Sequence, residues 1–197
     1  MRLAIYGGAF DPFHGGHLAV IRELLSRDLC DRVLVVPAGR SPLKPPAHAS
    51  ADDRLAMVRL GTAGLAGVEV WEGELDRAGP SWTVDTLEAL CGLHPHDQLW
   101  LVLGEDAWRG LDGWHRPARV LELARPLVLA RDGRAPDAAT LPPGAVVLPD
   151  FAVPAASREI RELLCRGQEV GNLLPPAVAA FIRERRLYGC GKDATCP

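Results

Sequence analysis

Two histidines with a spacing of three, His14 and His17, stand in the segment "GGAFDPFHGGHL", which covers residues 7–18. The segment follows a short apolar run at residues 3–6, and four of its residues are glycine. Glycine lets a ligand approach the backbone closely, and a helix start presents free N–H groups and a positive dipole end. The pattern is typical of a phosphate site in which imidazoles donate hydrogen bonds to oxygens that gain charge.

The arrangement of glycines separates this segment from two common phosphate loops. It is not GxGxxG, and it is not GxxxxGK[ST], because histidines stand where the lysine of that loop would be. A structural interpretation competes with the functional one, since His14 and His17 can also cap a helix or hold the turn. The pair within H-G-G-H, directly after a first strand, favours the functional interpretation.

Apolar runs and segments of helical spacing alternate along the whole chain. Buried strands are predicted at residues 2–6, 32–38, 68–71, 98–104, 125–131 and 145–150. Helices are predicted at residues 17–28, 51–64, 79–93, 105–110, 117–124, 157–167 (with Ser157 as its cap) and 175–188. This alternation predicts an α/β, Rossmann-like doubly wound parallel sheet of five to six strands with helices on both faces. We expect one domain over residues 1–188 and a flexible C-terminal tail at 189–197.

The composition limits the classes of partner. The chain has 197 residues, 48% of them hydrophobic, and a net charge of -3, which argues against binding of long nucleic acid through bulk charge. No apolar run approaches the roughly 20 residues of a membrane helix. The five cysteines are odd in number and scattered, and no secretory leader is recognisable, so we expect a reduced, cytoplasmic protein. A homo-oligomer is compatible with all of this.

The segment "GGAFDPFHGGHL" resembles the HxGH signature of the nucleotidyltransferase superfamily, and more closely that of bacterial nicotinate-mononucleotide adenylyltransferases. Further similar stretches follow in the family's order over nearly the whole chain: "SPLK" (41–44), "GPSWTVDTL" (79–87), "GED" (104–106), Trp114, "LARDG" (129–133) and "AASREIR" (155–161). Departures from the family pattern include Leu43, Trp82, Ala156 and Arg158, which stand in place of His, Tyr, Ser and Thr; of the last stretch only Ser157, Ile160 and Arg161 are kept.

The resemblance implies a reaction of NAD biosynthesis, in which ATP and nicotinate mononucleotide give nicotinate adenine dinucleotide and pyrophosphate. The mononucleotide phosphate would attack the α-phosphorus of ATP in line. This nucleophile is already an anion, so the site needs neither a general base nor a covalent intermediate, only orientation and charge neutralisation. Mg²⁺ is expected to be carried by the triphosphate, because clustered carboxylates for a protein metal site are missing from the sequence.

The resemblance also assigns residues to ATP. His14 and His17 would contact its phosphates, with His17 nearest the α-phosphate, and Lys44 and Arg161 would complete the catalytic set. The remaining ATP-binding residues would be Gly8, Ala9, Phe10, Gly104, Asp106 and Ser157. Asp106 is interpreted either as a ligand of the ribose hydroxyls or as a carboxylate that stabilises a helix start. Arg158 is interpreted either as a further phosphate ligand or as a solvent-facing residue.

The matching positions for nicotinate mononucleotide are Lys44, Trp82, Thr83, Asp85, Trp114 and Arg131. An aromatic face can stack on the pyridine ring, and Thr83 offers a backbone N–H and a hydroxyl to its carboxylate. Trp82 and Trp114 are alternatively packing residues, and Arg131 is alternatively a surface residue.

Three other functions compete with this one. The same chemistry on nicotinamide mononucleotide differs only in whether the pocket offers donors for a carboxylate or acceptors for an amide. A pantetheine-phosphate adenylyltransferase is less similar, because that family usually has Thr at the position of His14 and is shorter. A nucleotide-binding regulator without catalysis is suggested by the altered stretch 155–158, but the intact His14, His17, Lys44 and Arg161 favour an enzyme.

Overall fold

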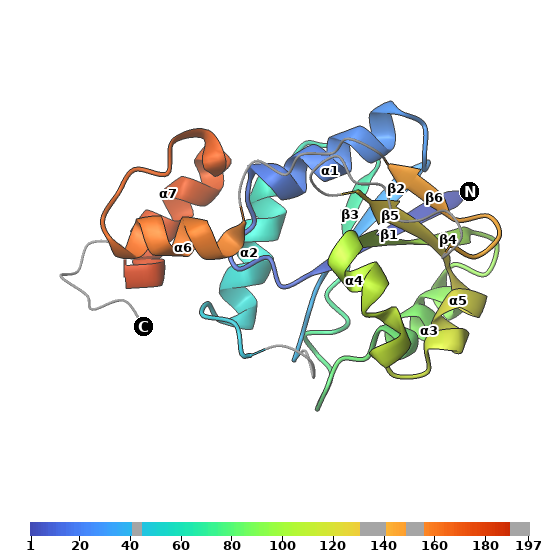
Figure 1. The fold of residues 1–197 in the computed structure, drawn as a ribbon. Helices are drawn as coiled ribbons and strands as arrows, with labels where there is room; N and C mark the ends of the chain where they lie inside the picture. Colours follow the sequence, from blue (N-terminus) through green and yellow to red (C-terminus); the bar gives the residue numbers. More distant parts are fainter. Residues whose placement is uncertain (41–44, 131–140, 149–155, 190–197) are drawn as a thin grey trace.

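Six parallel strands form one sheet in the computed structural model, which describes residues 1–40, 45–130, 141–148 and 156–189 (Figure 1). The strands are β1 (Arg2–Gly8), β2 (Arg32–Pro37), β3 (Val68–Val70), β4 (Gln98–Gly104), β5 (Arg125–Leu129) and β6 (Val146–Leu148). Their order is β3-β2-β1-β4-β5-β6, and every neighbouring pair is parallel. The predicted fold class is confirmed, with six strands.

Helices connect the strands and extend beyond them. The α-helices are α1 (Gly15–Ser26), α2 (Ala51–Thr62), α3 (Thr83–Leu93), α4 (Glu105–Arg109), α5 (Pro117–Leu123), α6 (Ser157–Cys165) and α7 (Pro176–Arg185). Short 3-10 helices are η1 (Leu111–Gly113), η3 (Gly171–Leu173) and η4 (Leu187–Gly189). The first helix begins at Gly15 rather than at residue 17, which brings both histidines into its cap. Ser157 is not the cap of α6 as predicted but its first residue, because Ala156 takes the cap position.

Helices cover both faces of the sheet because alternate residues of each strand point to opposite sides. On one face, Ala4 and Tyr6 of β1 pack with Ile21 of α1, and this core continues into α2, α6 and α7. On the other face, Leu3 and Ile5 pack with α3 and α5. Both faces of the strands are buried, which explains why their sequences are continuous apolar runs.

The strand order places a topological switch point between β1 and β4. The chain runs from β1 outward through β2 and β3, and then returns to start the other half of the sheet at β4. The connections on the two sides of this point leave in opposite directions, so a crevice opens beyond the carboxyl ends of the two strands. Gly8 and Gly104, which end these strands, lie at the mouth of this crevice.

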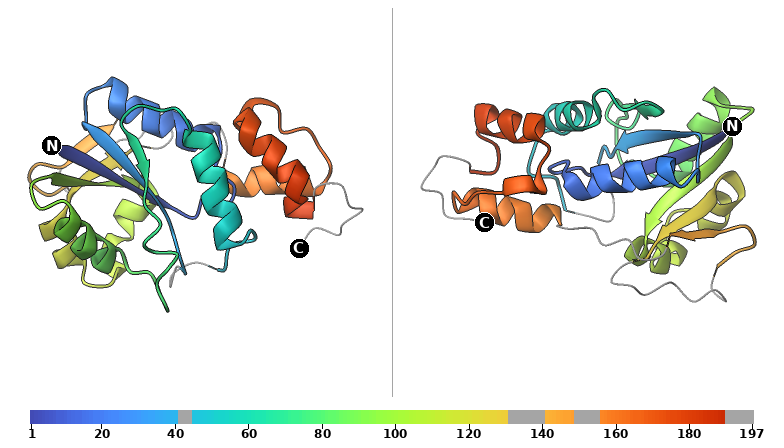
Figure 2. Two further views of the ribbon diagram at one scale, coloured as in Figure 1. Left: turned by 180° about the vertical axis from the view of Figure 1, so that it is seen from behind. Right: turned by 90° about the horizontal axis from the view of Figure 1, so that it is seen from above.

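The last two α-helices lie beyond the carboxyl edge of the sheet, on the far side of α2 from the strands (Figure 2). Ile160 of α6 and Val178 and Ile182 of α7 are fully buried and belong to the same core cluster as the α1 face. This apolar contact holds the start of α6 close to the histidine segment.

Within the described residues, no helix is long and apolar enough to cross a membrane. Cys30 and Cys91 are free thiols.

Candidate active site

Two histidines cap the start of α1, and each side chain accepts a hydrogen bond from a backbone N–H group of this turn. His14 is the N-cap residue, and its Nδ1 accepts a hydrogen bond from the Gly16 N–H at 3.1 Å. His17 lies three residues on, and its Nδ1 accepts from the His14 N–H at 3.2 Å. The arrangement is a capping box in which imidazoles take the places usually held by a hydroxyl and a carboxylate. The capping and the phosphate interpretations of the pair are therefore compatible.

These two hydrogen bonds select one tautomer of each ring. A nitrogen that accepts a backbone N–H carries no proton, so in the neutral imidazole the proton must lie on Nε2. His14 and His17 thus each present an Nε2–H donor while their Nδ1 atoms hold the helix start. The cap positions the donors, and the donors are what a phosphate oxygen needs.

Burial keeps both rings neutral. His14 is 3% exposed, and this desolvation lowers its pKa to about 4. Desolvation, with a smaller effect from His14, also holds the pKa of His17 well below its usual value. The rings are stacked, with centroids 3.7 Å apart and an interplanar angle of 24°. If both rings were protonated, the two imidazolium ions would repel each other. Each Nδ1 atom would also carry a proton and could no longer accept its backbone N–H.

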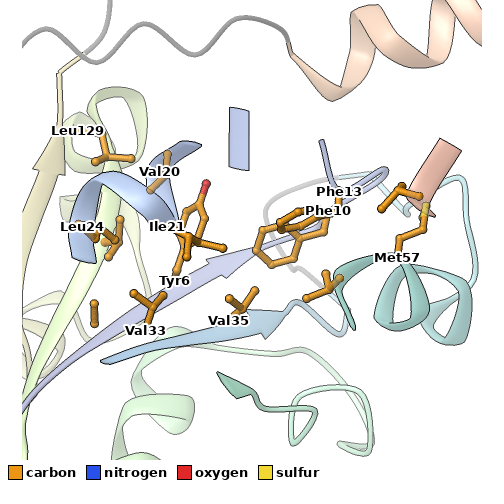
Figure 3. Close-up of a cluster of buried hydrophobic side chains, with 14 of the residues drawn as sticks. Tyr6, Phe10, Phe13, Val20, Ile21, Leu24, Val33, Val35, Met57 and Leu129 are labelled. Atoms are coloured by element: carbon orange, nitrogen blue, oxygen red, sulfur yellow. The ribbon is translucent and has the colours of Figure 1, made fainter. Parts of the chain in front are cut away.

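Aromatic side chains hold the pair in place. The His17 ring lies edge-on to Phe10 at a centroid distance of 4.9 Å and tilted against Phe13 at 5.4 Å. Figure 3 shows Phe10 and Phe13 between Tyr6 of β1 and Met57 of α2. Phe10 has a φ of 50°, in the left-handed region that few non-glycine residues adopt. A Cβ at Gly8 would lie 3.0 Å from the Phe10 ring, so glycine there makes room for this packing.

The start of α6 contacts the histidine segment directly. The Ser157 hydroxyl donates to the Pro12 carbonyl at 3.3 Å, and Arg161 Nη1 donates to the Asp11 carbonyl at 2.7 Å. The structure thereby brings Ser157 and Arg161 into contact with the residues that precede His14, which their positions in the sequence alone did not require.

Arg158 points away from this contact. Its side chain is 83% exposed, and Nε donates to Glu162 Oε1 at 2.9 Å along the surface of α6. Of the two interpretations of Arg158, the structure supports the solvent-facing one.

Asp11 is a buried carboxylate that the sequence interpretation missed. It is 4% exposed, and it accepts from the backbone N–H of His48 at 2.7 Å, the N–H of Ala49 at 3.1 Å and the hydroxyl of Tyr188 at 2.7 Å. The polarity of Asp11 inside an otherwise apolar "AFDPF" stretch is the one signal that the sequence offered.

A second missed residue is Arg54, a cation inside α2. Arg54 is 4% exposed, and its Nη1 donates to the carbonyls of Ala9 at 2.8 Å and Ala38 at 2.7 Å. These carbonyls follow β1 and β2, so one guanidinium joins the ends of two neighbouring strands. Burial lowers the pKa of Arg54, although the nearby Asp11 opposes this effect. A charged residue in a helix is usually expected to be exposed to solvent, so nothing in the sequence indicated this buried role.

Gly104 and Asp106 follow β4 on the other side of the switch point. Gly104 is the N-cap of α4 and has an extended backbone, and Asp106 is an exposed residue in the first turn of that short helix. Both interpretations of Asp106, as a ribose ligand and as a helix-start carboxylate, are compatible with this position.

The candidate pyridine residues gather around the start of α3. Trp82 is the N-cap residue, Thr83 is the first helical residue and Asp85 lies in the first turn. The Trp82 ring contacts the His115 ring at a centroid distance of 4.8 Å, which brings α3 beside the segment that follows η1 and contains Trp114. Trp82 and Trp114 are both partly buried against the core under α3 and α5, so packing accounts for one side of each ring.

A buried glutamate ties this region to the centre of the sheet. Glu74 is 8% exposed; its carboxylate accepts from the Thr86 hydroxyl at 2.7 Å and from the Gly39 N–H at 3.3 Å. Gly39 follows β2 and Thr86 lies in α3. The start of α3 is therefore anchored at the same edge of the sheet as the histidine segment.

Two predicted residues, Lys44 and Arg131, lie outside the described residues. Among the residues that are described, no group of three or more His, Cys, Asp or Glu side chains is arranged to hold a metal ion.

Comparisons with known proteins identify the family of this chain. Residues 5–163 match the cytidylyltransferase-like family. A protein of Chlorobaculum parvum named "Probable nicotinate-nucleotide adenylyltransferase" is 40% identical, over 95% of this chain and 99% of its own length. A relative of the same name from Gloeobacter violaceus is also 40% identical, over 95% of this chain and 96% of its own.

The fold is also found in a solved structure. The nicotinic acid mononucleotide adenylyltransferase of Plasmodium falciparum, complexed with NaAD, superposes with a TM-score of 0.78 at 18% identity and covers 96% of this chain and 98% of its own. At that identity the likeness supports the fold.

Proposed function

This chain belongs to the cytidylyltransferase-like family and, within it, to the nicotinate-nucleotide adenylyltransferases, and from that premise we propose how its residues perform the reaction. The enzyme transfers the adenylyl group of ATP to the phosphate of nicotinate mononucleotide and releases pyrophosphate, a step of NAD biosynthesis. The observation that carries the proposal is the stacked, neutral imidazole pair with two Nε2–H donors at the switch point of the sheet.

The reaction demands orientation more than acid–base chemistry. One phosphate oxygen of the mononucleotide forms a bond to the α-phosphorus of ATP while the bond from that phosphorus to the bridging oxygen of pyrophosphate breaks. No proton has to be removed from the nucleophile, so neutral donors are sufficient. Nε2–H groups that are fixed beforehand stabilise the charge that builds on the α-phosphate oxygens without any reorganisation.

The two helix starts divide the phosphates between them. His14 and His17 donate to the ATP phosphates, with His17 nearest the α-phosphate, and the backbone of Gly8, Ala9 and Phe10 flanks the nucleotide. Ser157 and Arg161 hold the β- and γ-phosphates and so favour the leaving pyrophosphate; Lys44 neutralises charge at the reacting centre. This assignment rests on the contact of Arg161 and Ser157 with the histidine segment.

The other substrate groups lie on either side of this centre. Gly104 and Asp106 contact the ATP ribose. Trp82 and Trp114 bound the pyridine ring, and Thr83 with the other N–H groups at the start of α3 donates to the nicotinate carboxylate. Asp85 and Arg131 complete the mononucleotide site. No side-chain hydrogen bond caps α3, which leaves these N–H groups available to a carboxylate.

Mg²⁺ fits this site as an ion that arrives with the triphosphate. The described residues offer no group of three metal ligands, and Mg²⁺ commonly binds substrate phosphates with few protein ligands. The ion would supply further neutralisation of phosphate charge. Orientation of the nucleotide is assigned to the protein's own donors. We place the enzyme in the cytoplasm as a single domain, either monomeric or homo-oligomeric, with no nucleic-acid or membrane partner.

Pyrophosphate release from ATP tests the proposal. Nicotinate mononucleotide, nicotinamide mononucleotide and 4′-phosphopantetheine are supplied in parallel, each with Mg²⁺. We expect release with the first to exceed release with the second by at least tenfold and the third to give none. Absence of release with all three acceptors would contradict the enzyme, and preference for the amide would assign it to nicotinamide mononucleotide.

A further inference from the structure

We propose that Asp11 is a positioning residue that sets the two phosphate-binding helix starts relative to each other, and that Tyr188 locks it in place from the C-terminal end of the chain. The inference rests on the proposed function, because it concerns how the histidine pair and Arg161 share one nucleotide. Neither Asp11 nor Tyr188 has to touch a substrate in this role.

The carboxylate of Asp11 joins four parts of the chain. It belongs to the histidine segment and accepts two backbone N–H groups, from His48 and Ala49, in the segment just before α2. Its Oδ1 accepts the Tyr188 hydroxyl, which comes from η4. Its Oδ2 lies 3.9 Å from Arg161 Nη1 of α6. Each partner approaches from a different element, so Asp11 cannot shift toward one without losing another.

The backbone of Asp11 makes the connection to the phosphate-binding residues. Its carbonyl accepts from Arg161 Nη1 at 2.7 Å, and the next carbonyl, of Pro12, accepts from the Ser157 hydroxyl at 3.3 Å. His14 follows three residues after Asp11 and caps α1. A displacement of Asp11 therefore moves Arg161 and the imidazole pair relative to each other, which changes the span available to a triphosphate.

The charges around Asp11 favour its ionised form. Burial opposes ionisation, but hydrogen bonds from His48, Tyr188 and Ala49 together with the charge of Arg161 hold its pKa below the usual value. Burial and the neighbouring Asp11 raise the pKa of Tyr188, so its hydroxyl stays a donor at every physiological pH. The Asp11 anion is thus held by two backbone N–H groups, the Tyr188 hydroxyl and the charge of Arg161, and the Nδ1 atom of the His48 ring lies 3.3 Å from its Oδ2.

Tyr188→Phe is the test variant because it removes the hydroxyl and keeps the partly buried ring. Asp11→Asn is the more direct change, but it places an amide among groups that all donate, and the chain can fail to fold. We expect Tyr188→Phe to lower kcat/KM for ATP about tenfold, while the KM for nicotinate mononucleotide stays within twofold. General destabilisation would not separate the two substrates in this way.

The matched control is Arg185→Gln. Arg185 of α7 contacts Asp53 of α2, with Nε to Oδ1 at 3.2 Å, and so it also ties the C-terminal helices to α2. It is not among the partners of Asp11. We expect kcat/KM for ATP and the KM for nicotinate mononucleotide of Arg185→Gln to stay within twofold of wild type. This result would show that the effect of Tyr188→Phe comes from its hydrogen bond to Asp11 and not from the loss of any contact between the C-terminal helices and α2.

A double variant shows whether Tyr188 acts through Arg161. In an Arg161→Gln background, Tyr188→Phe should change kcat/KM for ATP by less than twofold, because the group it positions is already gone. Three outcomes would each overturn the inference. Tyr188→Phe could impair the use of both substrates equally, or it could leave the kinetic constants unchanged. It could also lower kcat/KM for ATP by the full tenfold in the Arg161→Gln background. The proposed function fails separately, if wild type releases no pyrophosphate with any acceptor.

Discussion

The start of α6 contacts the segment that leads into α1, but the two helix starts are built in opposite ways. At α1, His14 and His17 satisfy the backbone through their Nδ1 atoms and form a reciprocal cap. At α6, Ala156 occupies the cap position and has no side-chain acceptor, so only Glu159 reaches back, to the Ala156 N–H at 3.3 Å. One start offers side-chain donors held by the cap, and the other leaves its first backbone N–H groups without a side-chain cap.

The difference shows two ways to bind phosphate at a helix start. At the α1 start, two backbone N–H groups donate to the histidine Nδ1 atoms and so fix both rings. Each ring is then held in one tautomer without net charge and presents its Nε2–H group as a donor. The α6 start relies on backbone donors and on the cation of Arg161. Fixed neutral donors suit the reacting α-phosphate, because the negative charge on its oxygens is redistributed during the reaction while its sign stays the same. A cation suits pyrophosphate, which leaves with its full charge.

The largest effect is expected at the α1 start. His17→Ala removes the donor nearest the reacting phosphate, and we expect kcat to fall about 100-fold, which corresponds to about 2.7 kcal/mol of transition-state stabilisation. Steady-state kinetics with saturating ATP measures it. His96→Ala, on an exposed loop, is the control and should keep kcat within twofold. A decrease in kcat of less than tenfold in His17→Ala would mean that His17 does not stabilise the transition state.

The pH dependence of stability tests whether the α1 imidazoles are neutral. The pKa of His14 is about 4 in the folded chain and 6.5 when unperturbed. Between these values the unfolded chain binds more protons, so stability is fully present above pH 6.5 and decreases as pH falls toward 4. The limiting slope is about 1.4 kcal/mol per pH unit, so His14 alone costs about 2 kcal/mol between pH 7 and pH 5.

Urea unfolding at pH 7 and pH 5 provides this measurement. The lowered pKa of Asp11 acts only below 3.8 and does not contribute in this interval. His14→Asn should reduce the difference between the two pH values, leaving the contribution of His17. Equal unfolding free energies of wild type at pH 7 and pH 5 would mean that the rings are already charged in the folded chain.

The missing cap of α6 can be supplied by substitution. Ala156→Ser introduces a hydroxyl that accepts from a first-turn N–H, and we expect a gain of about 1 kcal/mol and a rise in Tm of about 3 °C. Thermal unfolding measures the change. Ser50→Ala provides the reverse comparison, since the Ser50 hydroxyl accepts from the Asp53 N–H at 3.1 Å and caps α2. If Ala156→Ser leaves Tm unchanged, the α6 start already has its donors satisfied.

The smallest effect is expected at Arg158. Its ion pair with Glu162 is exposed, so Arg158→Ala should change the unfolding free energy by less than about 0.5 kcal/mol. The KM for ATP should stay within twofold, because the side chain points away from the histidine segment. A fivefold rise in KM would show that Arg158 turns toward bound nucleotide and would make the α6 start richer in cations than this structure indicates.

Part of the candidate site could be placed in the fold from the sequence because its residues follow strands. His14, His17, Gly104 and Asp106 come directly after β1 and β4, and parallel strands present their carboxyl ends at one edge of the sheet. The positions of Ser157 and Arg161 were predictable only through the family resemblance. Asp11, Arg54 and Tyr188 could not be predicted, because a charged or polar residue in a sequence gives no sign that partners distant in the chain will bury it.

The sequence by itself determined the alternation of strands and helices, the six apolar runs and the glycine-flanked pair of histidines, because periodicity and backbone freedom are local properties. Only the tertiary structure decided that His14 and His17 both lose their charge, that Arg158 faces solvent, and that Asp11 connects four segments. Burial and hydrogen-bond partners decide protonation and orientation. Both arise from residues that are as many as 177 positions apart, as Asp11 and Tyr188 are.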